Sequence, residues 1–227
     1  MEALRSVGRI GQAIGLVLGG VGVTLLTEAL QRAGLSTLWS TALALPPLVV
    51  VVLLTEVVFT SAVERYVTIR RWLAGNAFIE GVWLDQSAGG PESTYGITYI
   101  TYRGGEFQIS GREIDHNGRV LNFWHSIMSR FDGSTLEYIS HGGSADPSDV
   151  KEAYSYVKLP FSRSTLGKPP NRWSGYFVTI DRANRKVYTE GVRVSHEDVP
   201  ALERGSDLSE ILRRYFGRAR DALHAPQ

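Results

Sequence analysis

Two long uncharged segments near the N-terminus constrain this chain more than any other feature. From Ile10 to Thr27 and from Ala33 to Thr55 the sequence contains no Asp, Glu, Lys or Arg. The first segment would make about 27 Å of α-helix, roughly the thickness of a bilayer's hydrocarbon core. A cleavable signal peptide after Arg5 and Arg9 fits less well, because a second apolar segment follows at once. We therefore expect a transmembrane helical hairpin in residues 1–63.

The charges beside these segments predict how they sit in the bilayer. Arginine is concentrated on the outer flanks of the pair, which contain Arg5, Arg9, Arg65, Arg70 and Arg71. The connecting loop contains only Arg32. Because flanks rich in Lys and Arg stay in the cytoplasm, both ends of the hairpin are expected there. This predicts a multi-pass protein with cytoplasmic N- and C-termini, with the lipid bilayer as its first partner.

Glycines recur along the first apolar segment at short, helix-like intervals. At about 100° per residue they fall within an arc of roughly 80° on one helix face, and they are Gly8, Gly11, Gly15, Gly19 and Gly22. A glycine face lets another helix approach closely inside a membrane. Two interpretations stay open, namely packing against the second helix of the hairpin and packing between protomers of a homo-oligomer.

Glu56 follows directly on the second uncharged segment. A carboxylate inside hydrocarbon is costly and is usually functional. The simpler interpretation, which we favour, ends the span near Thr55 and leaves Glu56 among lipid headgroups beside Arg65.

The pattern changes to short β-type segments after an arginine-rich linker at residues 64–76. Residues 77–227 are expected to form one domain that ends in an amphipathic helix at Asp207–Leu223. The expected strands, rich in aromatic and β-branched residues, are Phe78–Gln86, Thr94–Arg103, Glu106–Ile114, Arg119–Arg130, Thr135–Ser140, Ala153–Phe161, Arg172–Asp181 and Lys186–Val194.

Short connections with Gly or Asn join most of these strands, which favours hairpins. We therefore expect an all-β antiparallel barrel of about eight strands with a C-terminal α-helix, since closure removes exposed strand edges. The alternative, a two-sheet sandwich, needs crossover connections that the short loops do not supply.

The chain lacks the patterns that mark catalytic and metal-binding proteins. It contains no GxxxxGK[ST], GxGxxG, GxSxG or HExxH motif, no cysteine, and only scattered histidines, of which His125 lies in an expected strand. The net charge of +1 gives no bulk attraction for DNA or RNA. We expect a non-enzymatic binding module with no metal and no cofactor.

Polar and aromatic residues occur on both faces of several expected strands, which suggests that part of the barrel interior lines a pocket. Aromatic rings stack on nucleobases, and guanidinium groups bind phosphates. The candidate ligand-binding residues are Trp83, Tyr99, Trp124, Tyr176 and Tyr188, with Arg112 and Arg193; Trp173 and Arg163 belong to the same two classes.

Two short-looped membrane helices, followed by Gly81-Val82-Trp83 at the start of an eight-strand domain, carry a resemblance that covers nearly the whole chain. The arrangement resembles the two-transmembrane β-barrel effectors of bacterial CBASS antiphage systems. That resemblance implies a cytosolic barrel that binds a cyclic oligonucleotide, foremost a cyclic dinucleotide, made by a nucleotidyltransferase during infection. It further implies that binding drives oligomerisation of the helices, disruption of the bacterial inner membrane and cell death.

The same Gly-x-Trp at a first strand is also similar to lipocalin-like barrels. That similarity implies a membrane-tethered carrier of a lipid or other hydrophobe. A packed barrel that recruits a protein partner is the third hypothesis.

Overall fold

The structure is a computed structural model that describes residues 7–88, 94–115, 118–149, 152–163, 168–180, 185–205 and 208–223. The chain divides into two compact units, residues 1–74 and 75–227, and each is described by itself.

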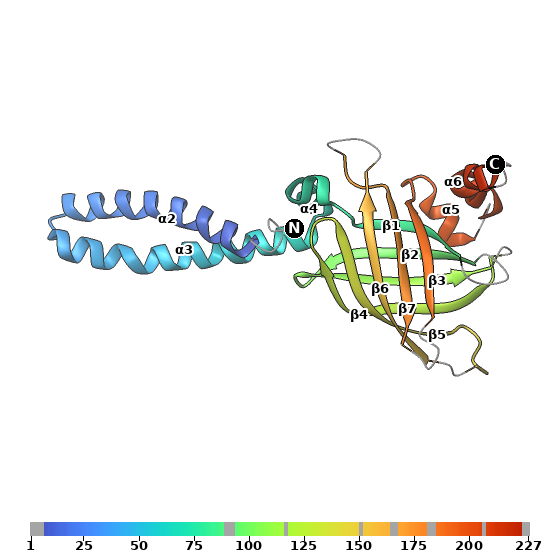
Figure 1. The fold of residues 1–227 in the computed structure, drawn as a ribbon. Helices are drawn as coiled ribbons and strands as arrows, with labels where there is room; N and C mark the ends of the chain where they lie inside the picture. Colours follow the sequence, from blue (N-terminus) through green and yellow to red (C-terminus); the bar gives the residue numbers. More distant parts are fainter. Residues whose placement is uncertain are drawn as a thin grey trace. The chain divides into compact units, whose positions relative to one another are not determined.

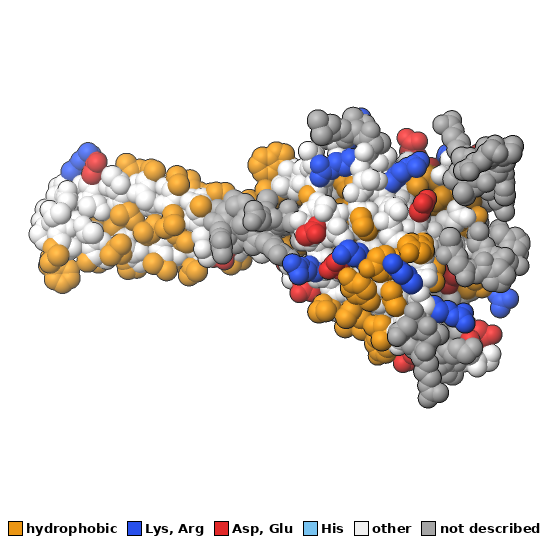
Figure 2. Space-filling model, viewed as in Figure 1, with side chains coloured by type: hydrophobic (Ala, Val, Ile, Leu, Met, Phe, Trp, Pro, Cys, Tyr) orange, Lys and Arg blue, Asp and Glu red, His pale blue; other side chains and the backbone are white. Residues whose placement is uncertain are grey.

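The first unit contains the expected hairpin. Helices α2 (Val7–Arg32) and α3 (Thr37–Arg65) lie side by side and antiparallel (Figure 1), joined through Gly34 at φ +92°. Both are long and apolar enough to cross a membrane. Hydrophobic side chains stand exposed along the length of the pair (Figure 2), where water would be an unfavourable neighbour and lipid a favourable one. Leu18 and Val49 are two of the exposed hydrophobic residues of these helices.

Three of the predicted glycines lie against α3. A methyl group added at Gly15 would come within 2.8 Å of the Val52 Cα, and one at Gly11 within 3.1 Å of the Glu56 Cα. One at Gly19 would collide with the side chain of Leu48. The part of the glycine face formed by Gly11, Gly15 and Gly19 therefore packs inside the hairpin.

The other two glycines are placed differently. Gly22 has no atom within 4 Å of an added methyl group, and the same is true of its neighbour Gly20. Gly8 lies in the first turn of α2, outside the residues whose side-chain surroundings are described. Packing between protomers stays a prediction.

Helix α3 continues past Thr55 to Arg65, and the end of the membrane span near Thr55 stays a prediction. Glu56 therefore lies within the helix. Gln12 Nε2 on α2 donates a hydrogen bond of 2.9 Å to Glu56 Oε2, so the carboxylate has a polar partner on the neighbouring helix.

A short helix, α4 (Val67–Ala74), follows α3 after a bend at Tyr66. Its Arg70 is buried, and Arg70 Nη1 donates hydrogen bonds to the carbonyls of Val63 at 2.9 Å and Glu64 at 2.6 Å. A guanidinium group at the carboxyl end of a helix satisfies free carbonyls and complements the helix dipole. Arg70 thereby caps α3.

The second unit is a closed eight-stranded antiparallel barrel, in which each strand pairs with the next and β1 pairs with β8 (Figure 1). The expected barrel is confirmed, and most strand ends fall within a few residues of those expected. After a 3₁₀ turn, η1 (Gly75–Ala77), the strands are β1 (Gly81–Ala88), β2 (Thr94–Arg103), β3 (Glu106–Ile114), β4 (Val120–Phe131), β5 (Thr135–Ser144), β6 (Glu152–Ser162), β7 (Arg172–Thr179) and β8 (Lys186–Arg193).

Aromatic side chains fill the end of the barrel at which β1 begins. Trp83 is fully buried and stacks on Trp173 with ring centroids 5.1 Å apart, and Phe161 meets both rings edge-on. Arg193 lies 4.9 Å from the Trp83 ring centroid and donates a hydrogen bond of 2.7 Å to the Phe78 carbonyl. These contacts close the base of the barrel.

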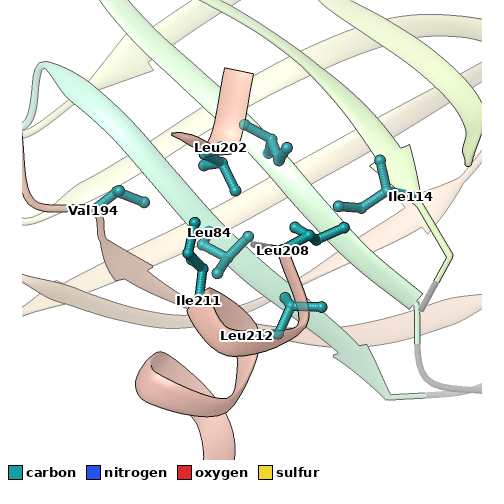
Figure 3. Close-up of a cluster of buried hydrophobic side chains, with 8 residues drawn as sticks. Leu84, Ile114, Val194, Leu202, Leu208, Ile211 and Leu212 are labelled. Carbon is teal, nitrogen blue, oxygen red and sulfur yellow. The ribbon is translucent and has the colours of Figure 1, made fainter. Parts of the chain in front are cut away.

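The C-terminal segment packs on the outside of β1, β2 and β3. It forms α5 (Val199–Arg204), which the sequence did not predict, and α6 (Leu208–Leu223), close to the expected helix. The cluster in Figure 3 combines side chains from these helices with outward-facing strand residues, and it contains Leu84, Ile97, Ile114, Val194, Leu202, Leu208, Ile211 and Leu212.

Candidate functional site

A cavity of about 300 Å³ occupies the half of the barrel away from the aromatic base. It lies among the last residues of β1, β3 and β5 and the first residues of β2, β4 and β6, because these meet at the same end of an antiparallel barrel. The volume is at the lower end of the range for small-molecule sites. Apolar surface and carboxyl, hydroxyl and amide groups share its walls.

Two glycines on the barrel wall, Gly111 and Gly96, give neighbouring side chains room to lie against it. A methyl group at Gly111 would collide with the Trp124 indole, and one at Gly96 would collide with the Asp85 carboxylate. The indole of Trp124 therefore lies against Gly111, and Trp124 also lines the cavity. A flat ring in a small cavity is a surface on which a second ring stacks favourably.

A row of polar side chains crosses the wall beside Trp124. Asp85 pairs with Gly96, Gly96 with Glu113, and Glu113 with Asn122 on successive strands. Asn122 Nδ2 donates a hydrogen bond to Glu113 Oε2, and Thr98 Oγ1 donates one of 2.8 Å to Asp85 Oδ2. Two carboxyl groups thus lie close together inside the barrel.

Burial dominates the electrostatics of Asp85. Desolvation by burial, the largest cause, raises the pKa of Asp85 to about 7. The Thr98 and Thr189 hydrogen bonds oppose the rise, and the nearby Glu113 charge adds to it. Burial also raises the pKa of the Tyr138 phenol, and the charge of Asp85 adds to that rise. The cavity therefore holds a carboxyl group that changes charge near neutral pH.

One hydrogen-bonding group of the cavity walls, the buried Trp173 Nε1, has no partner among the described residues. The hydroxyl of Thr189, also buried in the wall, interacts with Asp85 and lowers the pKa of that carboxyl group. A buried donor without a partner costs about 1–3 kcal/mol. A ligand or an ordered water that offered an acceptor would remove this cost.

The described lining carries no positive charge. It includes the carboxyl groups of Asp85, Glu113 and Asp149 and not one Lys or Arg. Arg119 and Arg185 begin or precede strands at the same end of the barrel and are exposed. Anionic groups of a ligand are thus better accommodated at this rim than on the cavity walls.

No protein-family model, curated protein or solved structure matches this chain. Within the described ranges, no group of three or more His, Asp or Glu side chains is placed to hold a metal ion.

Of the seven candidate ligand-binding residues, only Trp124 lines the cavity. Trp83 and Arg193 face inward but lie in the closed base, stacked on each other. Tyr176 and Tyr188 are outward neighbours on β7 and β8, and Lys186 lies over both rings.

The remaining two candidates lie on the barrel exterior beneath the C-terminal helices. Arg112 Nη2 donates hydrogen bonds to the carbonyls of Leu202 at 3.2 Å and Glu203 at 3.4 Å, so its guanidinium caps α5. Tyr99 packs against the cluster of Figure 3, and burial raises its pKa. Trp173, named from the sequence as a stacking residue, lines the cavity floor, and Arg163 is exposed.

The sequence did not predict that Asp85 and Glu113 lie close together inside the barrel, or that Thr98 and Thr189 line the cavity. The available signal was the alternation Trp83, Asp85, Ser87 along β1, which places an acid on the same face as a buried tryptophan. A second signal was strand glycines such as Gly96 and Gly111, because glycine inside a strand often marks close approach of another group.

Proposed function

We propose that this protein is a non-catalytic, membrane-anchored receptor whose barrel binds a small molecule in its interior and whose helix hairpin carries the output. The observation that supports it best is the cavity itself, a polar chamber with the Trp124 indole on its wall, inside a closed barrel. The two membrane-length helices on the same chain supply the second half of the proposal. A barrel whose interior was filled by side chains at normal packing density would leave no cavity of this size.

On the resemblance to CBASS effectors, the proposed ligand is a cyclic oligonucleotide. A nucleobase is the part of such a ligand that suits the walls, because Trp124 offers a stacking face and the Asp85 and Glu113 carboxyl groups accept hydrogen bonds from base N–H groups. The phosphates belong at the rim, toward Arg119 and Arg185, since the described walls carry only negative charge.

The proposed output is oligomerisation of the hairpins in the bacterial inner membrane, followed by membrane disruption and death of the infected cell. Arginine-rich flanks favour cytoplasmic termini, which puts the barrel in the compartment where such a ligand would be made. The faces of α2 around Gly20 and Gly22 are open and would serve for contacts between protomers. Ligand drives assembly only by the amount that it binds the assembled state more tightly.

Binding to the full chain in lipid nanodiscs tests the input half. A panel of cyclic di- and trinucleotides should contain at least one ligand, and Trp124→Ala should weaken it about tenfold to hundredfold, as expected for loss of one stacked base. Tyr188→Ala, which removes an exposed ring from the outer wall, is the matched control and should leave affinity unchanged. Trp124→Phe keeps an aromatic ring and should retain most of the binding. Weak binding by Trp124→Ala is then due to the loss of stacking and not to misfolding.

Expression in bacteria tests the output half. Toxicity that requires the ligand-producing enzyme, and that Gly15→Leu abolishes while nanodisc-bound protein still binds ligand, would support the proposal. If none of the panel binds the wild-type chain, the cyclic-oligonucleotide receptor is rejected.

One observation favours the hydrophobe carrier as a second candidate. Leu159, Val157 and Phe177 give the β6 and β7 side of the cavity an apolar wall. Mass spectrometry of the purified chain under native conditions would then detect a lipid that leaves on denaturation of the barrel. A protein that carries none contradicts this candidate.

A further inference from the structure

The described walls of the barrel cavity contain acids and no basic side chain. Asp85, Glu113 and Asp149 contribute carboxyl groups to the lining, and no Lys or Arg of the described residues joins them. Asp85 and Glu113 pair with Gly96 from its two sides, so they stand on the first and third of three neighbouring strands and interact electrostatically. A positively charged group between them would offset both their mutual repulsion and their lost solvation.

Aromatic rings surround these carboxyl groups. Trp124, Tyr138, Trp173 and Phe177 line the same cavity. The faces of aromatic rings attract cations, and rings of this kind form the cages that hold quaternary ammonium groups. Anion sites, by contrast, are built from guanidinium, ammonium or backbone N–H groups. The lining therefore has the chemistry of a site for an organic cation.

A second observation, independent of the acids, indicates that the ligand also carries an oxygen. Trp173 is only 3% exposed, and its Nε1 has no partner among the described residues. A methyl group at Gly191 would collide with this nitrogen, so the N–H lies against Gly191, whose partner on the next strand is Asp85. A neutral oxygen a few bonds away from a cationic nitrogen would reach the N–H while the nitrogen stays beside the carboxyl group.

We propose that the barrel interior is a site for a small organic cation, an amine or a quaternary ammonium group, that carries a neutral oxygen acceptor. Asp85 and Glu113 hold the positive nitrogen, the Trp124 indole packs against its carbon atoms, and the Trp173 N–H donates to the oxygen. This inference goes beyond the proposed function, because it gives the cavity a second class of ligand that needs neither phosphate nor the rim. A nucleobase in the same cavity would compete with it.

Protonation of Asp85 gives the cation site a pH dependence. Burial, the largest cause, raises the pKa of Asp85 to about 7, so the carboxyl group is mostly neutral at pH 6 and mostly ionised at pH 8. The other titratable groups that face this part of the cavity are Glu113, Tyr138 and Asp149. Because only the ionised carboxylate attracts a cation, affinity should rise by up to about tenfold from pH 6 to pH 8. A bound cation should also release a proton near pH 7.

Two probes that differ in charge alone test the site. Choline and its neutral analogue dimethylbutanol, in which carbon replaces the nitrogen, share one shape and one hydroxyl group. Ethanolamine represents the amines, and tetramethylammonium has the charge without the oxygen. Each is titrated by calorimetry against the full chain in a maltoside detergent at pH 8, because this detergent contains no amine. We expect choline or ethanolamine to bind at least about tenfold more tightly than the neutral analogue, and several-fold more tightly than tetramethylammonium.

Four variants locate the effect. Asp85→Asn keeps the side-chain shape, and it should weaken cation binding about tenfold and remove the pH dependence. Glu113→Gln should also weaken binding, and it supplies the charge test if Asp85→Asn does not fold. Trp173→Phe keeps a ring but removes the N–H, so the preference for choline over tetramethylammonium should disappear. Glu190→Gln changes an exposed carboxyl group on the outer face of β8 and should change nothing. The unfolding temperature of each variant is measured alongside.

The outcomes separate the cation site from the proposed function. Cation binding that depends on Asp85 and rises with pH, without binding of any cyclic oligonucleotide of the panel, supports the cation site and rejects the cyclic-oligonucleotide receptor. A cyclic dinucleotide that binds while neither cation does rejects the cation site and leaves the receptor standing. The cation site is also rejected if dimethylbutanol binds as tightly as choline, or if neither Asp85→Asn nor Glu113→Gln weakens binding.

Discussion

The hairpin gives a prediction that depends on individual contacts. Gly15→Ala puts a methyl carbon 2.8 Å from the Val52 Cα, where carbon atoms normally stay about 3.5–4.0 Å apart. Backbone cannot rotate away as a side chain can, so α2 and α3 must separate locally by roughly 1 Å. Overpacking of this kind costs about 1–3 kcal/mol.

A matched series isolates that cost. Gly20→Ala gains the same helix propensity as Gly15→Ala, about 1 kcal/mol in water, but its added methyl group meets no atom within 4 Å. The difference between the two variants is therefore the packing term alone. Gly19→Ala should fall between them, since it meets the flexible end of Leu48 rather than backbone.

The assay uses the absence of cysteine from the chain. Cysteines introduced at Leu18 and Val49, both exposed on the hairpin surface, carry nitroxide labels whose dipolar coupling reports helix separation. Titration with SDS from mixed micelles then gives a midpoint for each variant. We expect Gly15→Ala to separate first and Gly20→Ala last. A midpoint for Gly20→Ala as low as that for Gly15→Ala would refute packing inside the hairpin as the role of this glycine face.

Three further predictions concern stability of the full chain in detergent. The folded-state pKa of Asp85, raised to about 7 from 3.8, means that the folded state binds the proton more tightly. The contribution of Asp85 to stability should be greatest below about pH 4 and fall by at most about 4 kcal/mol up to pH 7, and Asp85→Asn should remove this decline from the thermal-unfolding profile. Arg70→Gln should expose the last amides of α3 to hydrogen exchange by removing its cap, whereas Arg71→Gln, at an exposed position, should not. Arg193→Met should cost about 2–4 kcal/mol in chemical unfolding through loss of a charged hydrogen bond and of the contact with Trp83; an unchanged midpoint would contradict closure of the base by this residue.

Element identity was predictable because it depends on local patterns. Uncharged length marked α2 and α3, and alternating β-type residues between turns marked all eight strands. The helix α5 escaped prediction because its six residues carry little periodicity, and it is held by tertiary contacts of Leu202 and by the guanidinium of Arg112.

Site residues were harder to predict because they depend on which face of a strand points inward. That choice is set by register with two neighbouring strands, which a single sequence does not specify. Aromatic and arginine residues are common in ligand-binding sites and were therefore named as candidates. In the structure, however, Arg112 caps α5 and Arg193 lies over the Trp83 ring. The acid at Asp85 was overlooked because an isolated carboxylate in a strand ordinarily faces solvent.

The contacts inside the barrel connect the cavity to the segment through which the chain enters β1. Trp173 lines the cavity and stacks on Trp83, whose Nε1 donates a hydrogen bond of 3.0 Å to the Ile79 carbonyl. Arg193 covers the same ring and holds the Phe78 carbonyl. A ligand that recruits the free Trp173 N–H therefore acts on a ring that is one contact away from residues 78–79. Rigid stacks of this kind transmit a change only if they have two arrangements of differing ligand affinity, so a Trp83→Phe variant that binds ligand normally but has lost toxicity would identify this stack as the element that switches.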